Sequence, residues 1–149
     1  MLEELRISGL GVIDEACLEF GPGLTALTGE TGAGKTMVVT GLGLLFGGRG
    51  DAGLVRHGAA RAAVDGTVRV TDDLRRRAED LGADVEDGVL TLSRTVGSDG
   101  RSRAQVGGRP VPVAVLAEFG AALVAVHGQA EQVRLRTTAA QREALDSFG

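Results

Sequence analysis

The stretch that decides the fold is residues 24–46, which read LTALTGETGAGKTMVVTGLGLLF. Within it, residues 29–36 match the phosphate-binding pattern G-x-x-x-x-G-K-[ST] at every fixed position. The surroundings also fit, because residues 24–28 predict a strand and residues 35–46 have apolar side chains at helical spacing. The alternative is a glycine turn that matches by chance, and this strand–loop–helix context favours the phosphate-binding loop.

Each fixed residue of this loop has a physical reason. Glycines let successive backbone N–H groups turn toward one anion, and the N-terminus of the following helix adds its dipole. The only lysine among the 16 basic residues lies here, where its ammonium would neutralise the β- and γ-phosphates of a nucleotide, and the next hydroxyl would ligate Mg²⁺. The predicted nucleotide-binding residues are Gly29, Glu30, Thr31, Gly32, Ala33, Gly34, Lys35 and Thr36, with Thr36 on the metal.

Length and composition restrict the class of protein. A chain of 149 residues with 43% hydrophobic residues can form one domain with a core. There is no apolar run of about 20 residues and no signal sequence, which predicts a soluble intracellular protein. The single cysteine, Cys17, excludes a disulfide framework and is expected to be a small buried residue. The net charge of −4 argues against a wholly basic nucleic-acid binder but allows a local basic patch.

The rest of the chain alternates short strands and helices. Gly41 and Gly43 weaken the helix after the loop, so we expect them to pack closely on a sheet, and Gly47-Gly48 should end it. Strands are predicted at 2–8, 15–20, 61–70, 89–96, 102–107 and 123–126, and helices at 72–82, 112–122 and from 139 onward. The segments 89–96 and 102–107 should form a hairpin around residues 98–100.

The sequence does not name a reaction. ATP hydrolysis also needs an acidic residue after an apolar strand, and the nearest candidate is Asp65 after Ala62-Ala63-Val64. That strand is short and weakly apolar, so we interpret Asp65 as a strand-end or turn residue rather than a metal ligand. A GTPase base-reading motif is excluded because there is no second lysine.

The opening of the chain closely resembles the N-terminus of the bacterial RecN family of DNA-repair ATPases, which are related to SMC and Rad50 proteins. The resemblance covers most of the chain in order and rests on residues 1–16, 20–36, 47–49, 54–58 and 126–129. The Glu30-Thr31 pair favours RecN over RecF, whose loop usually has Asn-Gly there.

This resemblance implies an α/β P-loop NTPase fold, the N-terminal lobe of an ABC/SMC-type head, with a mixed sheet, an antiparallel β region and flanking helices. Residues 1–149 would run from the Walker A loop to the Q-loop and end where a coiled coil begins. Walker B and the signature sequence would then belong to a C-terminal lobe. ATP with Mg²⁺ would bind between two heads of a homodimer, and DNA and possibly a recombinase would be partners.

The resemblance also implies roles for two residues outside the loop. Gln129 matches the Q-loop glutamine, a second Mg²⁺ ligand, although a glutamine here could instead cap the following helix. Arg49 matches an arginine of SMC heads that reaches the nucleotide phosphates, or else it complements the C-terminal dipole of the preceding helix. His57 and His127 receive no catalytic role, and no catalytic residue is expected in this segment.

Two groups of arginines are candidates for DNA contact. The run Arg75-Arg76-Arg77 lies among seven acidic residues, so a solvated helix face is the better interpretation. The hairpin that carries Arg94, Arg101, Arg103 and Arg109 is the best candidate for contact with DNA phosphates, although ordinary exposed charges remain the favoured interpretation.

Together these inferences predict the ATP-binding lobe of a cytoplasmic, nucleoid-associated ATPase acting in DNA double-strand-break repair, in which ATP drives engagement of two heads on DNA. The segment alone should not hydrolyse ATP, because Walker B and the signature are missing. Two alternatives are a self-contained P-loop kinase or nucleotidase, and a non-catalytic module that binds DNA or protein.

Overall fold

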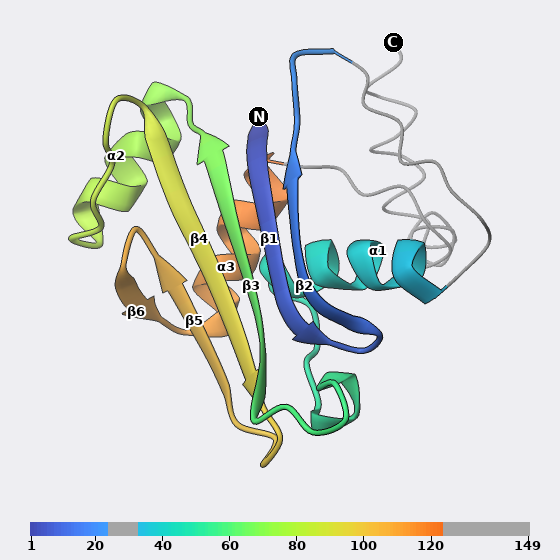
Figure 1. The fold of residues 1–149 in the computed structure, drawn as a ribbon. Coiled ribbons are helices and arrows are strands. Elements are labelled where there is room, and N and C mark those ends of the chain that lie inside the picture. The colour runs from blue at the N-terminus through green and yellow to red at the C-terminus, as the bar shows by residue number, and fades with distance from the viewer. Residues whose placement is uncertain (24–32, 124–149) are drawn as a thin grey trace, which may run out of the picture.

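The computed structural model describes residues 1–23 and 33–123 of the chain. In these residues a six-stranded sheet has the order β2-β1-β3-β4-β5-β6, and each neighbouring pair is antiparallel (Figure 1). The strands are β1 (Leu2–Leu10), β2 (Ile13–Glu19), β3 (Arg61–Arg69), β4 (Val89–Gly97), β5 (Ser102–Val106) and β6 (Arg109–Val111).

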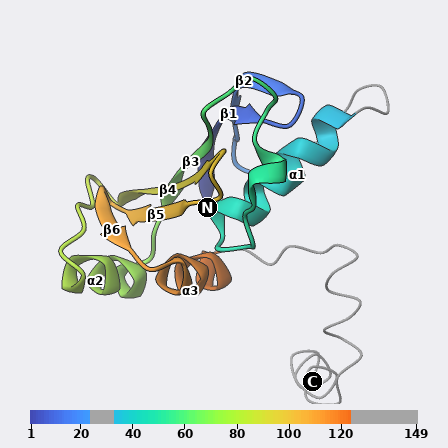
Figure 2. The same cartoon turned by 90° about the horizontal axis from the view of Figure 1, so that it is seen from below.

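The three α-helices of the described part, α1 (Ala33–Leu45), α2 (Asp72–Asp80) and α3 (Val113–Leu123), lie on one face of the sheet and leave the other face open (Figure 2). The strands alternate accordingly, as in β3, where every second residue is buried or half-buried on the helix side. The core lies between the two layers, and its largest fully buried side chains are Phe119, Leu5, Ile7, Leu10, Leu45, Leu90, Leu92 and Leu116.

The described elements confirm most of the predicted ones, with boundaries that differ by at most two residues. Two short elements were missed, the strand β6 and the 3₁₀ helix η1 (Ala52–Leu54). The expectation for Cys17 was wrong, because it is exposed on the open side of the edge strand β2. The strand at 24–28, the end of the strand at 123–126 and the last helix lie outside the described residues.

The turn between β1 and β2 is fastened to the segment that follows α1. The N–H of Gly11 donates to the carbonyl of Leu54 at 2.9 Å, and the N–H of Arg56 donates to the carbonyl of Gly9 at 2.7 Å. The Met37 side chain of α1 occupies the place where a Cβ of Gly11 would lie, and Gly11 has a φ of 53°. The N-terminal half of α1 is therefore held against the end of the sheet.

Helix α2 confirms the solvated-face interpretation for Arg75 and Arg76, which are exposed. It is wrong for Arg77, which is half-buried with its guanidinium 5.2 Å from the centroid of the Phe119 ring on α3. Thr71 caps its N-terminus, where Oγ1 accepts from the N–H of Leu74 at 3.4 Å. Arg75 pairs with Asp72 one turn earlier at 3.4 Å and approaches Glu79 one turn later at 4.0 Å. None of the helices in the described ranges is long and apolar enough to span a membrane.

Candidate nucleotide-binding site

The described part of the predicted loop is the first turn of α1. Ala33, Gly34, Lys35 and Thr36 begin this helix, whereas Gly29, Glu30, Thr31 and Gly32 lie outside the described residues. Lys35 is half-buried and Thr36 is exposed. The prediction that a helix starts directly at the GKT end of the pattern is confirmed.

This first turn has the chemistry of an anion site. The first four N–H groups of a helix have no partner within it, and the helix dipole puts partial positive charge at the same end. The first turn of α1 has no acidic side chain to neutralise that charge, and the Lys35 ammonium adds a full positive charge. Among the described residues, no atom outside the helix backbone and the chain neighbours of Gly34 lies within 4 Å of the position a Cβ would take there, which leaves room for a ligand.

The middle of α1 packs directly on the sheet at Gly41. A Cβ on this glycine would lie 2.9 Å from Cδ1 of Ile7 on β1. Gly66 of β3 likewise leaves space for the buried Leu45 side chain. The predicted close packing is therefore confirmed for Gly41, but it is wrong for Gly43, which faces open space.

The C-terminal end of α1 is closed by two glycines, as the sequence predicts. The N–H of Gly47 donates to the Leu44 carbonyl at 3.1 Å, and the N–H of Gly48 donates to the Gly43 carbonyl at 2.8 Å. Gly47 has a φ of 87°, a left-handed conformation that favours glycine. These two bonds form a Schellman motif, which ends the helix sharply.

Arg94 is buried, whereas the sequence predicted an exposed arginine on the β4–β5 hairpin. It is 3% exposed, and its guanidinium donates to the carbonyls of Leu44 (3.2 Å) and Gly48 (2.9 Å) at the end of α1 and to Oγ of Ser102 on β5 (2.8 Å). Burial lowers the pKa of Arg94. The expectation of an exposed hairpin arginine was therefore wrong, because this positive charge complements the negative end of the helix dipole.

Strand alternation could have predicted the burial of Arg94. In β4 the buried residues are Leu90, Leu92, Arg94 and Val96, so every second position faces the helices. A charged side chain in that series must either find partners inside or disrupt the core. Arg94 finds these partners in the backbone carbonyls of Leu44 and Gly48, at the C-terminal end of the helix that begins at the phosphate-binding loop.

Arg49 lies beyond the C-terminal end of α1, whereas Lys35 is in its first turn. A 13-residue helix rises about 20 Å, so the described residues do not bring these two side chains together. Arg49 is exposed, and Arg94 is the arginine that donates to the Leu44 carbonyl in the last turn of α1 and to the Gly48 carbonyl just beyond it. A contact of Arg49 with nucleotide phosphates stays a prediction.

Asp65 lies in the middle of β3, so its interpretation as a strand-end or turn residue was wrong. Its side chain is on the open face, where Arg6 of β1 is its cross-strand neighbour. In residues 1–23 and 33–123 no group of three or more His, Cys, Asp or Glu side chains could hold a metal ion. His57 is an exposed turn residue, and Gln129 and His127 lie outside the described residues.

Comparison with known proteins assigns this chain to a family. The family described as AAA domain matches residues 4–106. The chain is 58% identical over 146 residues to DNA repair protein RecN of Streptomyces coelicolor, covering 97% of this chain and 26% of that protein. The chain is a RecN-like member of the AAA domain family. DNA repair protein RecN of Mycobacterium tuberculosis is 49% identical over 156 residues, covering 99% of this chain and 27% of that protein.

Solved structures agree with this RecN-like fold. A chain from a study of ATP-driven dimerisation and DNA-stimulated activation of SMC ATPases superposes with a TM-score of 0.69 at 19% identity, covering 99% of both chains. The recombination mediator protein RecF superposes with a TM-score of 0.62 at 19% identity, over 78% of this chain and 29% of RecF. The RecN-like chain thus has the fold of SMC and RecF heads, and it spans about a quarter of the length of the curated relatives it matches.

Proposed function

We propose that this chain is the ATP-binding lobe of a RecN-like ATPase that acts in DNA double-strand-break repair. One observation carries the proposal. The pattern at residues 29–36 leads directly into a helix that presents Lys35 and Thr36 in its first turn, in a chain 58% identical to a protein named for DNA repair. The SMC-like fold supports it, because the segment then supplies one part of a head.

The donor set fits a polyphosphate with Mg²⁺. The Lys35 ammonium would neutralise the β- and γ-phosphates, and the backbone amides from Gly29 to Gly34 would donate to phosphate oxygens. The Thr36 hydroxyl would ligate Mg²⁺, which when bound neutralises further phosphate charge. Gln129 as a second metal ligand and Arg49 as a further phosphate contact belong to this proposal.

The rest of the machinery would come from elsewhere in the protein. A C-terminal lobe would supply Walker B, the catalytic glutamate and the signature sequence, and a second head in a homodimer would close over the nucleotide. DNA, and possibly a recombinase, would be the macromolecular partners, in the cytoplasm at the nucleoid. ATP binding would engage two heads, and hydrolysis would release them.

The test compares ATP turnover by the full-length protein, by its Lys35→Ala variant and by the 149-residue chain. We expect turnover by the full-length protein, with Lys35→Ala reducing it at least tenfold because the phosphate charge is no longer neutralised. Arg76→Gln on α2 is the matched control, since it removes an exposed cation far along the chain from the loop. Turnover by the 149-residue chain alone would favour a self-contained kinase or nucleotidase instead.

A further inference from the structure

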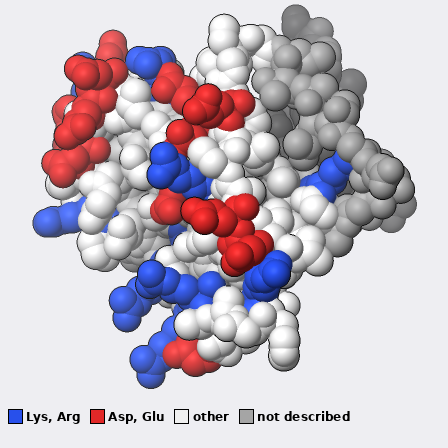
Figure 3. All heavy atoms as spheres, viewed as in Figure 1, with Lys and Arg blue, Asp and Glu red and all other residues white. Residues whose placement is uncertain are grey.

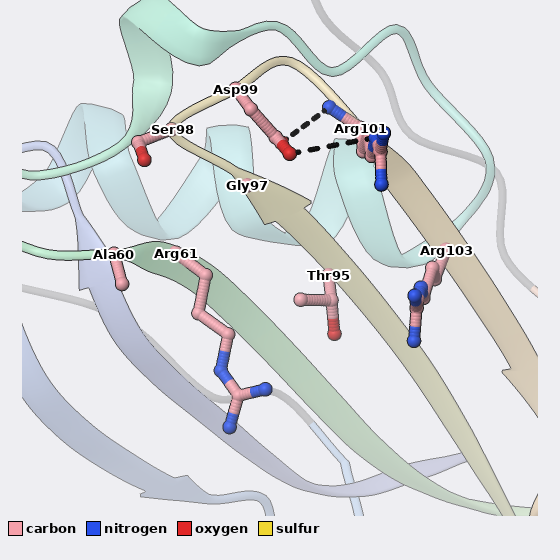
Figure 4. Close-up of a pocket in the computed structure, with 8 residues that line it drawn as sticks. All are labelled: Ala60, Arg61, Thr95, Gly97, Ser98, Asp99, Arg101 and Arg103. Atoms are coloured by element: carbon pink, nitrogen blue, oxygen red, sulfur yellow. Dashed lines mark hydrogen bonds and ion pairs between the residues drawn. The ribbon is translucent and has the colours of Figure 1, made fainter.

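Three arginines lie together at one end of the open face of the sheet. Arg61 begins β3, and Arg101 and Arg103 lie at the start of β5. The strand register pairs Arg61 with Gly97 and Arg103 with Thr95, so the two arginines flank β4 from its two sides. A shallow cavity of about 360 Å³ lies between them, also lined by Ser98 and Asp99 (Figure 4).

The positive charge of this arginine cluster, Arg61, Arg101 and Arg103, is largely uncompensated. Within residues 1–23 and 33–123, neither Arg61 nor Arg103 makes an ion pair or a side-chain hydrogen bond. Asp99 is the one acidic residue lining the cavity, and its Oδ2 lies 3.6 Å from Nε of Arg101, whose side chain is 84% exposed. Figure 3 shows basic side chains gathered at this end of the molecule, below a belt of acidic ones. In a chain of net charge −4, this is a local site for anions.

The backbone beneath the cluster is held in place before any ligand arrives. The N–H of Ser98 donates to the carbonyl of Ala60 at 2.9 Å, which ties the β4–β5 turn to the start of β3. The N–H of Gly97 donates to the Arg101 carbonyl at 2.7 Å, and Oδ1 of Asp99 accepts from the N–H of Arg101 at 3.0 Å. Little ordering of the backbone is needed on binding, which favours affinity.

The sequence alone groups different arginines. Arg94 is buried under the sheet and points to α1, and Arg109 lies beyond the opposite end of β5, beside Gly82. Arg61 belongs to the cluster and these two arginines do not, although Arg61 is 40 residues before Arg101 in the chain. Only the antiparallel pairing of β3 with β4 brings it to the β4–β5 turn.

We infer that this cluster binds the phosphate backbone of duplex DNA. The register places Arg61 and Arg103 two strand spacings apart across the sheet and two residues apart along it, so their backbones are about 12 Å apart. This separation is wide for one small anion and suits neighbouring phosphates. Guanidinium groups with the nearby hydroxyls of Thr95 and Ser98 are typical phosphate donors. No aromatic side chain lines the cavity on which a base could stack, so the contact is to the backbone and is independent of sequence. The inference rests on the proposed function, which makes DNA the partner.

The experiment measures binding of a 30-base-pair duplex to the full-length protein without nucleotide, between 50 and 200 mM salt. The double variant Arg61→Gln/Arg103→Gln should bind more weakly, and the slope of log affinity against log salt should fall by about 0.9 for each arginine. The difference in affinity from the unmodified protein should therefore shrink about tenfold across this salt range. Arg76→Gln on α2 is the control for loss of a remote exposed cation and should leave the slope unchanged.

A second variant removes a negative charge from the cluster instead of a positive one. Asp99→Asn keeps a side-chain oxygen for the N–H of Arg101 but removes the one negative charge, so duplex binding should become tighter. The inference would be overturned if the double variant had the same duplex affinity and salt slope as the unmodified protein. Weaker duplex binding by Asp99→Asn would also overturn it. Displacement of duplex by polyglutamate at equal charge concentration would also overturn it, in favour of an acidic protein partner. ATP affinity is measured on the same samples, so that failure of the nucleotide site is recognised separately.

Discussion

Replacing Arg94 by methionine is the sharpest test of how α1 is fixed to the sheet. Methionine has a similar length and is apolar, so it can fill the buried space while removing all the donors. The change breaks three hydrogen bonds, to the carbonyls of Leu44 in the last turn of α1 and of Gly48 just beyond it, and to Oγ of Ser102. It also removes a positive charge from the negative end of the helix dipole.

The magnitude follows from these contacts. Each bond from the charged guanidinium to a carbonyl contributes about 2 kcal/mol, and the bond to Ser102 about 1 kcal/mol. Relief of the buried charge, whose pKa is already lowered by burial, offsets about 2 kcal/mol. The net loss in the free energy of unfolding is about 3 kcal/mol, a large part of the about 5–15 kcal/mol typical of a domain.

Urea unfolding followed by circular dichroism measures this loss. The midpoint should fall while the slope m stays the same, because the surface exposed on unfolding is unchanged. Ser102→Ala is the matched comparison, since it removes one hydrogen bond and keeps the charge, and it should lose about 1 kcal/mol. If Arg94→Met were as stable as Ser102→Ala, the hydrogen bonds from Arg94 would not fasten the end of α1 to the sheet.

Two further substitutions test local features of the fold. Thr71→Ala removes the N-cap of α2 and should lower the free energy of unfolding by about 1 kcal/mol, measured by the same urea titration; no change would mean that the 3.4 Å bond does not stabilise the helix. Gly47→Ala forces a Cβ to within 2.5 Å of the Ala117 backbone at a φ of 87° and should cost about 2–4 kcal/mol, and a neutral thermal melt would contradict the close approach of α3 to the end of α1.

The sequence predicted elements whose signal is local. Alternating apolar residues identified β3, and helical spacing with a Thr71 cap identified α2. Strand β6 was missed because it has three residues, includes Pro110 and follows Gly107-Gly108, which resembles a loop. Its pairing with β5 depends on tertiary contacts that no short window contains.

The surroundings of charged residues were harder to predict. Arg94 is satisfied by a carbonyl 50 residues away in sequence, so its burial could be inferred from strand alternation but its partners could not. The place of Arg61 in the arginine cluster could not be predicted either, because it depends on the pairing of β3 with β4, which are far apart in sequence. The chemistry of Lys35 and Thr36 was predictable, because adjacent residues at a helix start carry it.

Calorimetric titration of Mg²⁺-ATP into the full-length protein and its Lys35→Ala variant tests whether the first turn of α1 binds the nucleotide. We expect the variant to bind ATP about 30-fold more weakly or worse, since truncating one member of a charge pair costs about 2 kcal/mol or more. Its circular dichroism spectrum should remain that of the folded protein, because Lys35 is only half-buried. Equal ATP affinity in a folded variant would show that the first turn of α1 is not the nucleotide site.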